Sequence, residues 1–367
     1  MIVVCAPDKF RGSLSADEAA AALADGARAA GCGAVLHPLA DGGEGTMELI
    51  RAARDGRRCT AAVTDALGRP HTASFALLDD GTAVVEAAEA IGLAQLAPGE
   101  RDVLAATSAG AGELLTAALD AGARRIVVGL GGSATVDGGL GLLRAVGCTL
   151  RDGEGGELAG SGADVLRVRA IDRSRLDPRL ASTPVLLALD VTSPLAGPHG
   201  AAPVFGPQKG ATPEQVAELD AGLARLGLLF GPAAEIEGAG AAGGLGAALA
   251  WLGAEPRAGA DVVMEETRFA DALAGAALCL TGEGSVDAQT AAGKTVARVI
   301  AACRERGVPC AVIGGAVDPA AADALYRLGA AAVVAAGGGP MSLDDALSHA
   351  RGNVATSARA LCGMLRG

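Results

Sequence analysis

Residues 129–139 read GLGGSATVDGG and place five glycines within eleven positions. A β-branched run precedes this stretch and an apolar helical pattern over 140–146 follows it. Strand, glycine loop and helix form the arrangement in which backbone N–H groups and a helix N-terminus face an anion. Ser133, Thr135 and Asp137 lie among the glycines, where a phosphate or its Mg²⁺ can use them. The alternative is a tight turn that needs glycine only for positive φ, but so many glycines exceed what one turn requires, and the stretch favours anion binding.

Length and composition limit the fold and the class of partner. A chain of 367 residues favours two domains. Half of the residues are apolar and only 2% are aromatic, a composition suited to helices packed closely on a parallel sheet. The net charge is −12 and no run of Lys or Arg offsets it, so we expect no nucleic acid partner.

The cysteines and the N-terminal stretch bear on the compartment. Eight cysteines are scattered without a Cys-x-x-Cys pair, which predicts reduced thiols and neither disulfides nor a zinc site. Residues 1–5 read directly as a strand without the basic region of a signal peptide. No apolar run reaches the roughly 18 residues of a transmembrane span. We therefore expect a soluble, cytoplasmic protein with no membrane partner.

The first predicted strand, over 2–5, ends in a polar loop before a helix over about 16–30. Lys9, Arg11 and Ser13 lie in this loop. Cations at a helix N-terminus oppose the helix dipole, so their presence there points to an anionic substrate and not merely to a solvated helix start. The loop also follows the carboxyl end of a strand, where open α/β sheets bind ligands.

The second predicted strand, over 35–39, runs into an acidic glycine loop over 40–46. Asp41 and Glu44 in this loop are candidates for binding Mg²⁺ or substrate hydroxyls. Asp41 can equally serve only to cap the turn. The loop alone leaves both interpretations open.

Short alternating strands over 59–86 mark the entry to a second domain. Further on, a predicted strand over 185–190 ends at Asp190, a position suited to a general base. Lys209 lies among glycines before a predicted helix over 213–230, a position suited to a phosphate. Each can be an ordinary loop residue, but the recurrence of polar loops at strand ends favours a functional role.

Two stretches match the dinucleotide-binding pattern formally. The match at 238–244 lacks a convincing preceding strand, and its expected acidic ribose partner falls near Asp261, in a predicted helix. The match at 129–134 follows a good strand, but its downstream region reads as loop. Neither stretch fits a dinucleotide site well.

The last third alternates between strands and helices, which predicts a parallel sheet with right-handed crossovers. Its first strand is expected to end at residue 281, before a loop that holds Glu283 and Asp287. Gly293-Lys294-Thr295 matches the end of a P-loop, but Ala288 occupies the first glycine position, so we reject a Walker A loop. Lys294 stays a candidate phosphate ligand at a helix N-terminus. The expected elements are strands over 278–281, 309–314 and 331–336, and helices over 294–307, 320–329 and 342–365.

Seven loops taken together resemble the type 1 glycerate kinases of bacteria. The resemblance runs in order from residue 1 to about 320. It implies ATP-dependent phosphorylation of D-glycerate to 2-phosphoglycerate, with Mg²⁺. The matching stretches are 6–15 (APDKFRGSLS), 40–46 (ADGGEGT), 129–139, 190–195 (DVTSPL), 205–210 (FGPQKG), 238–244 (GAGAAGG) and 281–289 (TGEGSVDAQ).

The resemblance also implies a two-domain α/β fold with the active site in the cleft. Because the N-terminal and C-terminal regions read as one α/β type, we expect a Rossmann-like parallel-sheet domain with a second α/β domain inserted. The predicted boundaries give a discontinuous domain over 1–65 and 263–367 and an insert over 66–262. The expected partner is a small-molecule substrate, D-glycerate, and the expected assembly is a monomer or homodimer.

Phosphoryl transfer requires charge neutralisation and alignment, which suggests a role for each polar loop. Asp190 is the expected base and belongs to a catalytic set with Glu283 and Asp287, although the carboxylate roles can be permuted. The candidates for binding nucleotide phosphates are Gly131, Gly132, Ser133, Thr135, Lys209, Gly240, Gly243 and Lys294. The candidates for binding glycerate are Asp8, Lys9, Arg11, Ser13 and Asp41. The candidates for Mg²⁺ are Asp41, Glu283 and Asp287.

Three other functions remain open on the sequence alone. A nicotinamide-dependent oxidoreductase would explain the two formal dinucleotide patterns and predicts NADH binding. A non-catalytic binding protein would hold a sugar acid without turnover. A kinase of another small hydroxy acid would differ only in the substrate pocket.

Overall fold

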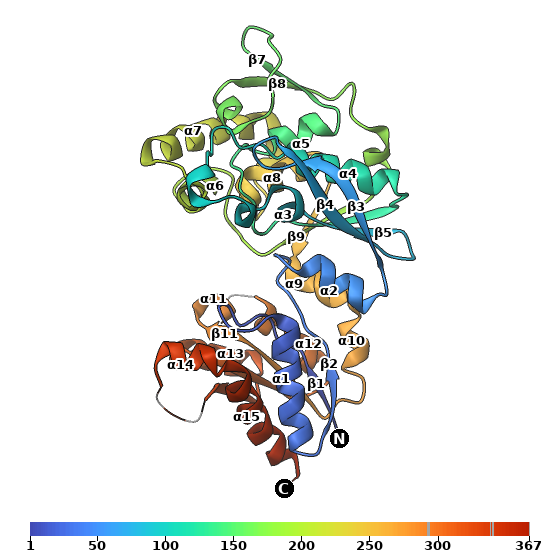
Figure 1. The fold of residues 1–367 in the computed structure, drawn as a ribbon, viewed down its shortest axis with the longest axis vertical. Coiled ribbons are helices and arrows are strands. Elements are labelled where there is room, and N and C mark those ends of the chain that lie inside the picture. The colour runs from blue at the N-terminus through green and yellow to red at the C-terminus, as the bar shows by residue number, and fades with distance from the viewer. Residues whose placement is uncertain (292–293, 338, 340, 367) are drawn as a thin grey trace. The chain divides into compact units, whose positions relative to one another are not determined.

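The chain folds into two compact units (Figure 1). The first unit comprises Met1–Asp41 and Ala260–Gly367, and the second comprises Gly42–Gly259. Residues 42–65, which were expected in the first domain, pack with the second unit. The domain boundaries expected at 65/66 and 262/263 stay a prediction. A computed structural model describes residues 1–291, 294–337, 339 and 341–366.

The first unit is built on an open sheet of five parallel strands. The strand order is β13-β12-β11-β1-β2, so the order reverses between β1 and β11, where Val4 lies opposite Cys279. In doubly wound sheets such a reversal leaves a crevice at the carboxyl ends of the two strands. The parallel α/β fold predicted from the sequence is confirmed. The strands are β1 Ile2–Cys5, β2 Gly33–Leu36, β11 Leu278–Val286, β12 Cys310–Val317 and β13 Ala332–Ala335.

Helices cover both faces of this sheet (Figure 1). Helices α1 (Ala16–Ala29) and α15 (Ala350–Gly363) pack together on the face to which Val3 and Cys5 point. Helix α12 (Thr295–Glu305) contacts β11 and β12. Because side chains alternate along a strand, Cys279 and Cys310 are absent from the α1 face and point towards α12. Further helices are α9 Gly259–Glu266, α10 Phe269–Ala272, α11 Ala288–Ala291, α13 Pro319–Leu328 and α14 Leu343–Ser348.

The second unit holds a mixed sheet of six strands in the order β10-β9-β6-β5-β4-β3. Strands β3, β4 and β5 form an antiparallel meander, whereas β5, β6, β9 and β10 run parallel. The large apolar core of the unit lies between this sheet and its helices. The strands are β3 Arg57–Thr64, β4 Pro70–Leu77, β5 Thr82–Glu86, β6 Arg125–Gly129, β9 Val185–Leu189 and β10 Glu255–Ala258, and a separate antiparallel pair is β7 Thr149–Asp152 and β8 Val168–Asp172.

Helix α7 of the second unit agrees with the helix expected over 213–230. Helix α7 begins at Pro213 after an N-cap at Thr212, whose side chain accepts a hydrogen bond from the Gln215 amide, and it ends at Phe230 as predicted. None of the helices in the described part of the chain has the length and apolarity to span a membrane. The helices are α2 Thr46–Ala53, α3 Ala87–Ile91, α4 Ala109–Asp120, α5 Leu140–Ala145, α6 Ala201–Phe205, α7 and α8 Ala241–Trp251.

Several local predictions are wrong. The strand expected to end at residue 281 continues to Val286, so Glu283 lies in a strand and not in a loop. This extension is possible because Gly282 and Gly284 lie where an added Cβ would be 1.9 Å from the Ile313 carbonyl oxygen and 2.9 Å from the Arg11 amide nitrogen. The helix expected over 342–365 is divided at His349 into α14 and α15. Gly293 lies outside the described residues.

Candidate functional site

The first unit places a polar segment at the point where its strand order reverses. After β1 the chain continues beside β11, because the Ala6 amide donates to the Leu280 carbonyl (2.7 Å) and the Asp8 amide donates to the Gly282 carbonyl (2.9 Å). Asp8 therefore lies beyond the carboxyl end of β1, next to Gly282 in the middle of β11. This is the position at which open α/β sheets bind ligands.

Asp8 is buried at this end of the sheet. Its Oδ1 accepts a hydrogen bond from the Lys9 amide (2.6 Å), and its Oδ2 accepts one from the Thr295 hydroxyl (2.9 Å) at the start of α12. Burial raises the pKa of Asp8, and the negative charge of Asp41 raises it further. The hydrogen bonds oppose this rise by favouring the carboxylate.

Glu283 adds a carboxyl group with an unusual environment. Its Oε1 is buried and has no hydrogen-bond partner among the described residues. Burial raises the pKa of Glu283, and the charges of Asp8 and Asp287 add to the rise. A hydrogen bond from the Thr290 side chain to the carboxyl group and the charge of Lys294 oppose it. An orphaned buried carboxylate oxygen is costly, so a ligand that contacts it would remove that cost.

Asp287 follows β11 directly and is exposed. Its Oδ1 accepts hydrogen bonds from the amides of Gln289 (2.8 Å) and Thr290 (3.3 Å), which fixes the start of α11. The charge of Asp41 raises the pKa of Asp8, and the charges of Asp8 and Asp287 raise the pKa of Glu283. The four carboxyl groups therefore lie close to one another. Such a group of carboxylate oxygens suits a hard cation such as Mg²⁺.

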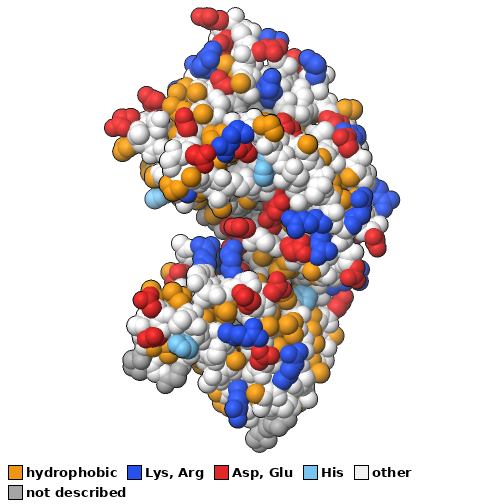
Figure 2. All heavy atoms as spheres, viewed as in Figure 1, with side chains coloured by type: hydrophobic (Ala, Val, Ile, Leu, Met, Phe, Trp, Pro, Cys, Tyr) orange, Lys and Arg blue, Asp and Glu red, His pale blue; other side chains and the backbone are white. Residues whose placement is uncertain are grey.

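The predicted cations of this unit differ in their exposure. Lys9 is half-buried, Arg11 is exposed, and Lys294 is the N-cap residue of α12. The Ser13 hydroxyl donates to the Phe10 carbonyl (3.1 Å), so it holds the tight turn that carries Arg11. On the face shown in Figure 2, acidic and basic side chains are interspersed.

In the second unit, the glycine-rich residues 129–139 connect β6 to α5 at the carboxyl edge of the parallel strands. Glu86 at the end of β5 pairs with Gly129, and Gly129 pairs with Ala188 in β9. Asp190, which is half-buried and follows β9, therefore lies at the same edge. The structure thus brings the predicted base and the predicted phosphate loop to neighbouring strand ends.

Lys209 binds directly to this glycine-rich loop. Its side chain is 3% exposed, and its Nζ donates to the Thr135 carbonyl (2.8 Å) and the Ser133 hydroxyl (3.2 Å). Burial lowers the pKa of Lys209 to about 7, while the charge of Asp137 opposes the shift. The Thr135 hydroxyl is buried and has no partner in the described structure.

Asp137 organises the loop from inside. Its carboxylate accepts hydrogen bonds from the Ser108 hydroxyl (2.6 Å), the Ser108 amide (2.7 Å) and the amides of Gly139 and Gly141 (both 3.1 Å). Asp137 is fully buried, and burial raises its pKa against these hydrogen bonds. The sequence suggests Asp137 as a ligand for phosphate-bound Mg²⁺, but its carboxylate is committed to the fold.

The second glycine loop, residues 238–244, packs against the first. An added Cβ at Gly243 would be 2.0 Å from the Thr135 carbonyl oxygen, and the Gly138 amide donates to the Gly243 carbonyl (3.0 Å). An added Cβ at Gly240 would be 2.2 Å from the Pro194 carbonyl oxygen. These glycines are therefore required for close backbone packing, which places both loops and Lys209 in one cluster.

Gly131 and Gly132 lie in the first glycine-rich loop, residues 129–139, where the backbone makes further close contacts. An added Cβ at Gly131 would be 2.7 Å from the Gly43 Cα, and the Gly132 carbonyl accepts a hydrogen bond from the Leu93 amide (2.8 Å). Gly132 also has a positive φ of 74°. Glycine is needed at both positions for the path of the backbone.

Sequence reasoning missed two buried polar residues near these loops. Glu86 accepts hydrogen bonds from the amides of Met47 (2.6 Å) and Gly45 (3.3 Å) and so stabilises the N-terminus of α2. The Thr46 hydroxyl is buried without a partner among the described residues. A charged residue at the end of the apolar run 83–85 is the signal that could have identified Glu86.

Comparisons with known proteins cover the whole chain. The model of the glycerate kinase family matches residues 3–366. A glycerate kinase of Bacillus subtilis (strain 168) is 41% identical, with 100% of this chain and 98% of the relative aligned. A glycerate 2-kinase of Escherichia coli (strain K12) is 40% identical with the same coverage. A crystal structure provisionally named glycerate kinase 2, from Salmonella typhimurium LT2, superposes with a TM-score of 0.83 at 40% identity and covers 100% of this chain and 98% of its own. The chain belongs to the glycerate kinase family.

Proposed function

We propose that the protein transfers the terminal phosphoryl group of ATP to the 2-hydroxyl of D-glycerate, giving 2-phosphoglycerate and ADP with Mg²⁺. Membership of the glycerate kinase family supports the substrate, and the name of the Escherichia coli relative supports the 2-position. The observation that carries phosphoryl transfer is the buried Lys209 amine, held on a glycine-rich loop whose Thr135 hydroxyl has no partner among the described residues.

The nucleotide phosphates are proposed to bind at the glycine-rich loops of the second unit. Lys209 supplies positive charge, and the hydroxyls of Ser133 and Thr135 supply hydrogen bonds. The backbone around Gly131 and Gly132 supplies N–H groups at the carboxyl edge of β6. Gly240 and Gly243 act indirectly, because their packing shapes the loop. In the first unit, Lys294 at the N-terminus of α12 is a further phosphate ligand.

The acidic group of the first unit is proposed to hold the metal. The oxygens of Asp41, Glu283 and Asp287 fit Mg²⁺, which prefers carboxylate ligands. The Glu283 Oε1, which has no hydrogen-bond partner in the described part of the chain, supports this assignment. The bound ion would neutralise charge on the phosphate oxygens. Glu283 must be ionised to serve, so the nearby charge of Lys294 matters for its function.

The segment after β1 is proposed to bind glycerate. Arg11 and Lys9 supply positive charge for the substrate carboxylate, and Ser13 stabilises the turn that carries Arg11. Asp8 and Asp41 are acceptors for the substrate hydroxyls. Thr295 holds the Asp8 carboxylate in place through its hydrogen bond of 2.9 Å.

Asp190 is proposed to take the proton from the reacting hydroxyl. General-base catalysis contributes about 10²–10⁴-fold to a rate. We expect Asp190→Asn to lower kcat by about this factor while the KM for ATP changes little. Asp287→Asn is the matched control and should raise the Mg²⁺ concentration needed for half-maximal activity. Near-normal kcat in Asp190→Asn together with inactive Asp287→Asn at saturating Mg²⁺ would assign the base to Asp287.

The reaction is tested by coupling the product to enolase and pyruvate kinase without phosphoglycerate mutase. Steady pyruvate formation from ATP and D-glycerate is the expected result. A signal that requires added mutase would show 3-phosphorylation. Silence in both assays with ATP still bound would contradict the assignment of glycerate, and a panel of other hydroxy acids would then identify the acceptor.

We further propose that the protein works in the cytoplasm as a monomer or homodimer. All eight cysteines lie in the described residues and none forms a disulfide. This state suits a reducing compartment. Light scattering of the purified protein measures its assembly.

A further inference from the structure

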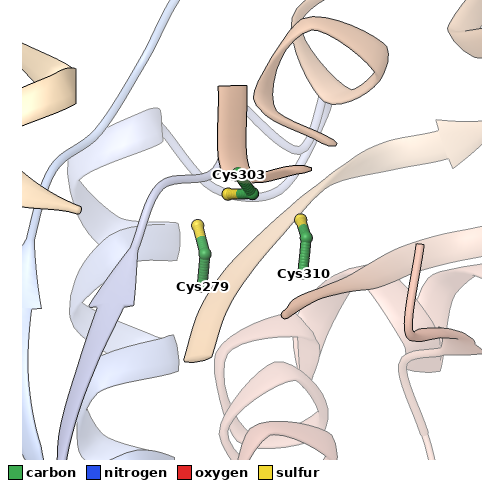
Figure 3. A group of neighbouring side chains, drawn as sticks. All are labelled: Cys279, Cys303 and Cys310. Atoms are coloured by element: carbon green, nitrogen blue, oxygen red, sulfur yellow. The ribbon is translucent and has the colours of Figure 1, made fainter. Parts of the chain in front are cut away.

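Three cysteine side chains converge in the core of the first unit (Figure 3). The sulfur atoms of Cys279, Cys303 and Cys310 all lie within 4.8 Å of one another. Their exposed fractions are 0%, 0% and 1%. The proposed kinase reaction uses none of them.

The fold brings these cysteines together from three different elements. Cys279 in β11 and Cys310 in β12 are directly paired in the register of the sheet. Cys303 lies in α12, on the helix that covers this face, next to the buried side chains of Val299 and Ile300. The three sulfurs therefore meet in an apolar layer between the sheet and the helix.

The number and spacing of the sulfurs favour a three-coordinate ion. When three sulfurs each lie about 2.3 Å from a central ion in a trigonal arrangement, they are about 4 Å from one another. The sulfurs here lie within 4.8 Å of one another, so they need to move inward only slightly to bind such an ion. The described residues offer no fourth Cys, His, Asp or Glu ligand to this group, whereas structural zinc takes four. Thiolate donors select soft ions.

The apolar surroundings favour a neutral product. A net charge buried without a partner is costly. Three thiolates would leave a negative charge around a monovalent or divalent ion, but they balance a trivalent ion completely. Hydrogen bonds from Cys279 and Cys310 lower the pKa of Cys303, which eases the loss of its thiol proton during the exchange.

We propose that Cys279, Cys303 and Cys310 form a binding site for a soft, trivalent, three-coordinate ion, of which arsenic(III) is the representative. Arsenous acid exchanges its three As–O bonds for three As–S bonds. The three thiol protons leave with the three hydroxides as water, and no atom changes its oxidation state. The product is neutral and joins β11, β12 and α12.

The experiment incubates the wild-type protein with arsenite for hours, because buried thiols react only during local opening. Native mass spectrometry is expected to show a gain of one arsenic and a loss of three protons. X-ray absorption at the arsenic edge is expected to show three sulfur neighbours. Two sulfurs with one oxygen would overturn the site, as would the absence of bound arsenic.

Substitutions identify which thiols take part. Cys303→Ser is expected to weaken arsenite binding at least tenfold, whereas Cys148→Ser, at a buried cysteine of the second unit, should leave it unchanged. Equal binding in the two variants would contradict the proposal. If Cys303→Ser does not fold, the sulfur count in the wild-type protein still decides. Tighter binding of Cu(I) than of arsenite, measured in the same way, would refute the preference for a trivalent ion. These readouts do not depend on kinase activity.

Discussion

At the scale of single residues, Lys209 combines a buried amine with two hydrogen bonds to the phosphate loop. Burial lowers its pKa to about 7, so in the free protein the amine loses its proton as the pH rises through 7. If the charged amine binds phosphate, kcat/KM for ATP should fall about tenfold for each pH unit above this pKa. The pH profile of kcat/KM between 6 and 9 measures the effect.

Lys209→Arg is the matched variant, because a guanidinium stays protonated throughout this range. The variant is expected to lose part of the activity at pH 6 through altered geometry but to show no alkaline decline. An identical alkaline decline in the variant would mean that another group titrates. Lys209→Met should lower kcat/KM for ATP most at pH 6, where the wild-type amine is charged, and progressively less as the pH rises.

His37 makes the stability of the first unit depend on pH in the acidic range. Its Nε2 lies 2.9 Å from the Thr267 hydroxyl, its ring lies 5.2 Å from the Phe269 ring, and burial lowers its pKa to about 4. The unfolded chain, with an ordinary histidine pKa near 6.5, binds more protons between these two values. His37 therefore lowers the free energy of unfolding as the pH falls from 6.5 to 4, by up to about 1.4 kcal/mol per unit.

His37→Gln keeps a polar contact to Thr267 without a titrating group. Denaturant unfolding at pH 7, 6 and 5 should show a weaker acid destabilisation in the variant than in the wild type. The raised carboxyl pKa values of Asp8 and Glu283 act in the opposite direction and are common to both proteins. Parallel pH dependences in the two proteins would contradict the role of His37.

At the scale of elements, the contact between the two glycine loops determines how the phosphate loop is held. Gly243 has a φ of 71°, and an added Cβ would be 2.0 Å from the Thr135 carbonyl oxygen. Gly253, beyond the end of α8, has a φ of 100°, and no atom of the described residues lies within 4 Å of its Cβ position. The two positions share unfavourable backbone geometry but differ in packing.

Gly253→Ala should cost about 1–2 kcal/mol from the positive φ alone. Gly243→Ala should cost more and also lower kcat/KM for ATP, because the Thr135 backbone must move. Thermal unfolding and steady-state kinetics of both variants measure the two effects. Equal destabilisation and equal activity in the two variants would show that the loop contact has no functional importance.

The accuracy of the sequence prediction also differs between elements. Helix α7 is predicted to the residue because a threonine N-cap with proline at the first position marks its start and glycine marks its end. The extension of β11 past Thr281 is missed because the Gly-Glu-Gly-Ser stretch has poor strand propensity, and its pairing with β12 depends on tertiary contacts.

The sequence predicts which residues form the site better than it predicts the hydrogen bonds that position them. Lys209, Ser133 and Thr135 stand out as polar residues among glycines, and the structure places them together. Their mutual hydrogen bonds join residues more than 70 positions apart, and local patterns carry no information about such pairings. For the same reason the role of Glu86 is not predicted, because its partners lie at the start of α2.

At the scale of the whole molecule, the two units differ in how their cores are assembled. In the described residues, the buried core of the second unit runs from Val63 to Ala254, with Cys59 and Ala61 packed against it. The core of the first unit combines Val3 and Leu23 with Leu280 and Leu361 from the other end of the chain. The second unit is therefore continuous in sequence, and the first is not.

Residues 42–259 expressed alone are expected to fold and to unfold cooperatively. Residues 260–367 alone should not, since β11 lacks its neighbour β1 and α15 lacks α1. The single tryptophan, Trp251, packs against Phe230 in the second unit, so its fluorescence directly reports the unfolding of the fragment 42–259. Gradual, non-cooperative loss of the signal would contradict independent folding.

The placement of β1 between β2 and β11 has a consequence for biosynthesis. Val3 pairs with Leu278, so the first strand to leave the ribosome must wait for one of its two neighbours. Translation at about 5–20 residues per second needs roughly 14–55 s to cover that separation. During this interval the second unit can complete its own core, while the apolar segment Ile2–Cys5 stays without β11. The nascent chain therefore passes through a stage in which a finished unit is tethered to an unfinished one, and the N-terminal strand then needs protection from aggregation.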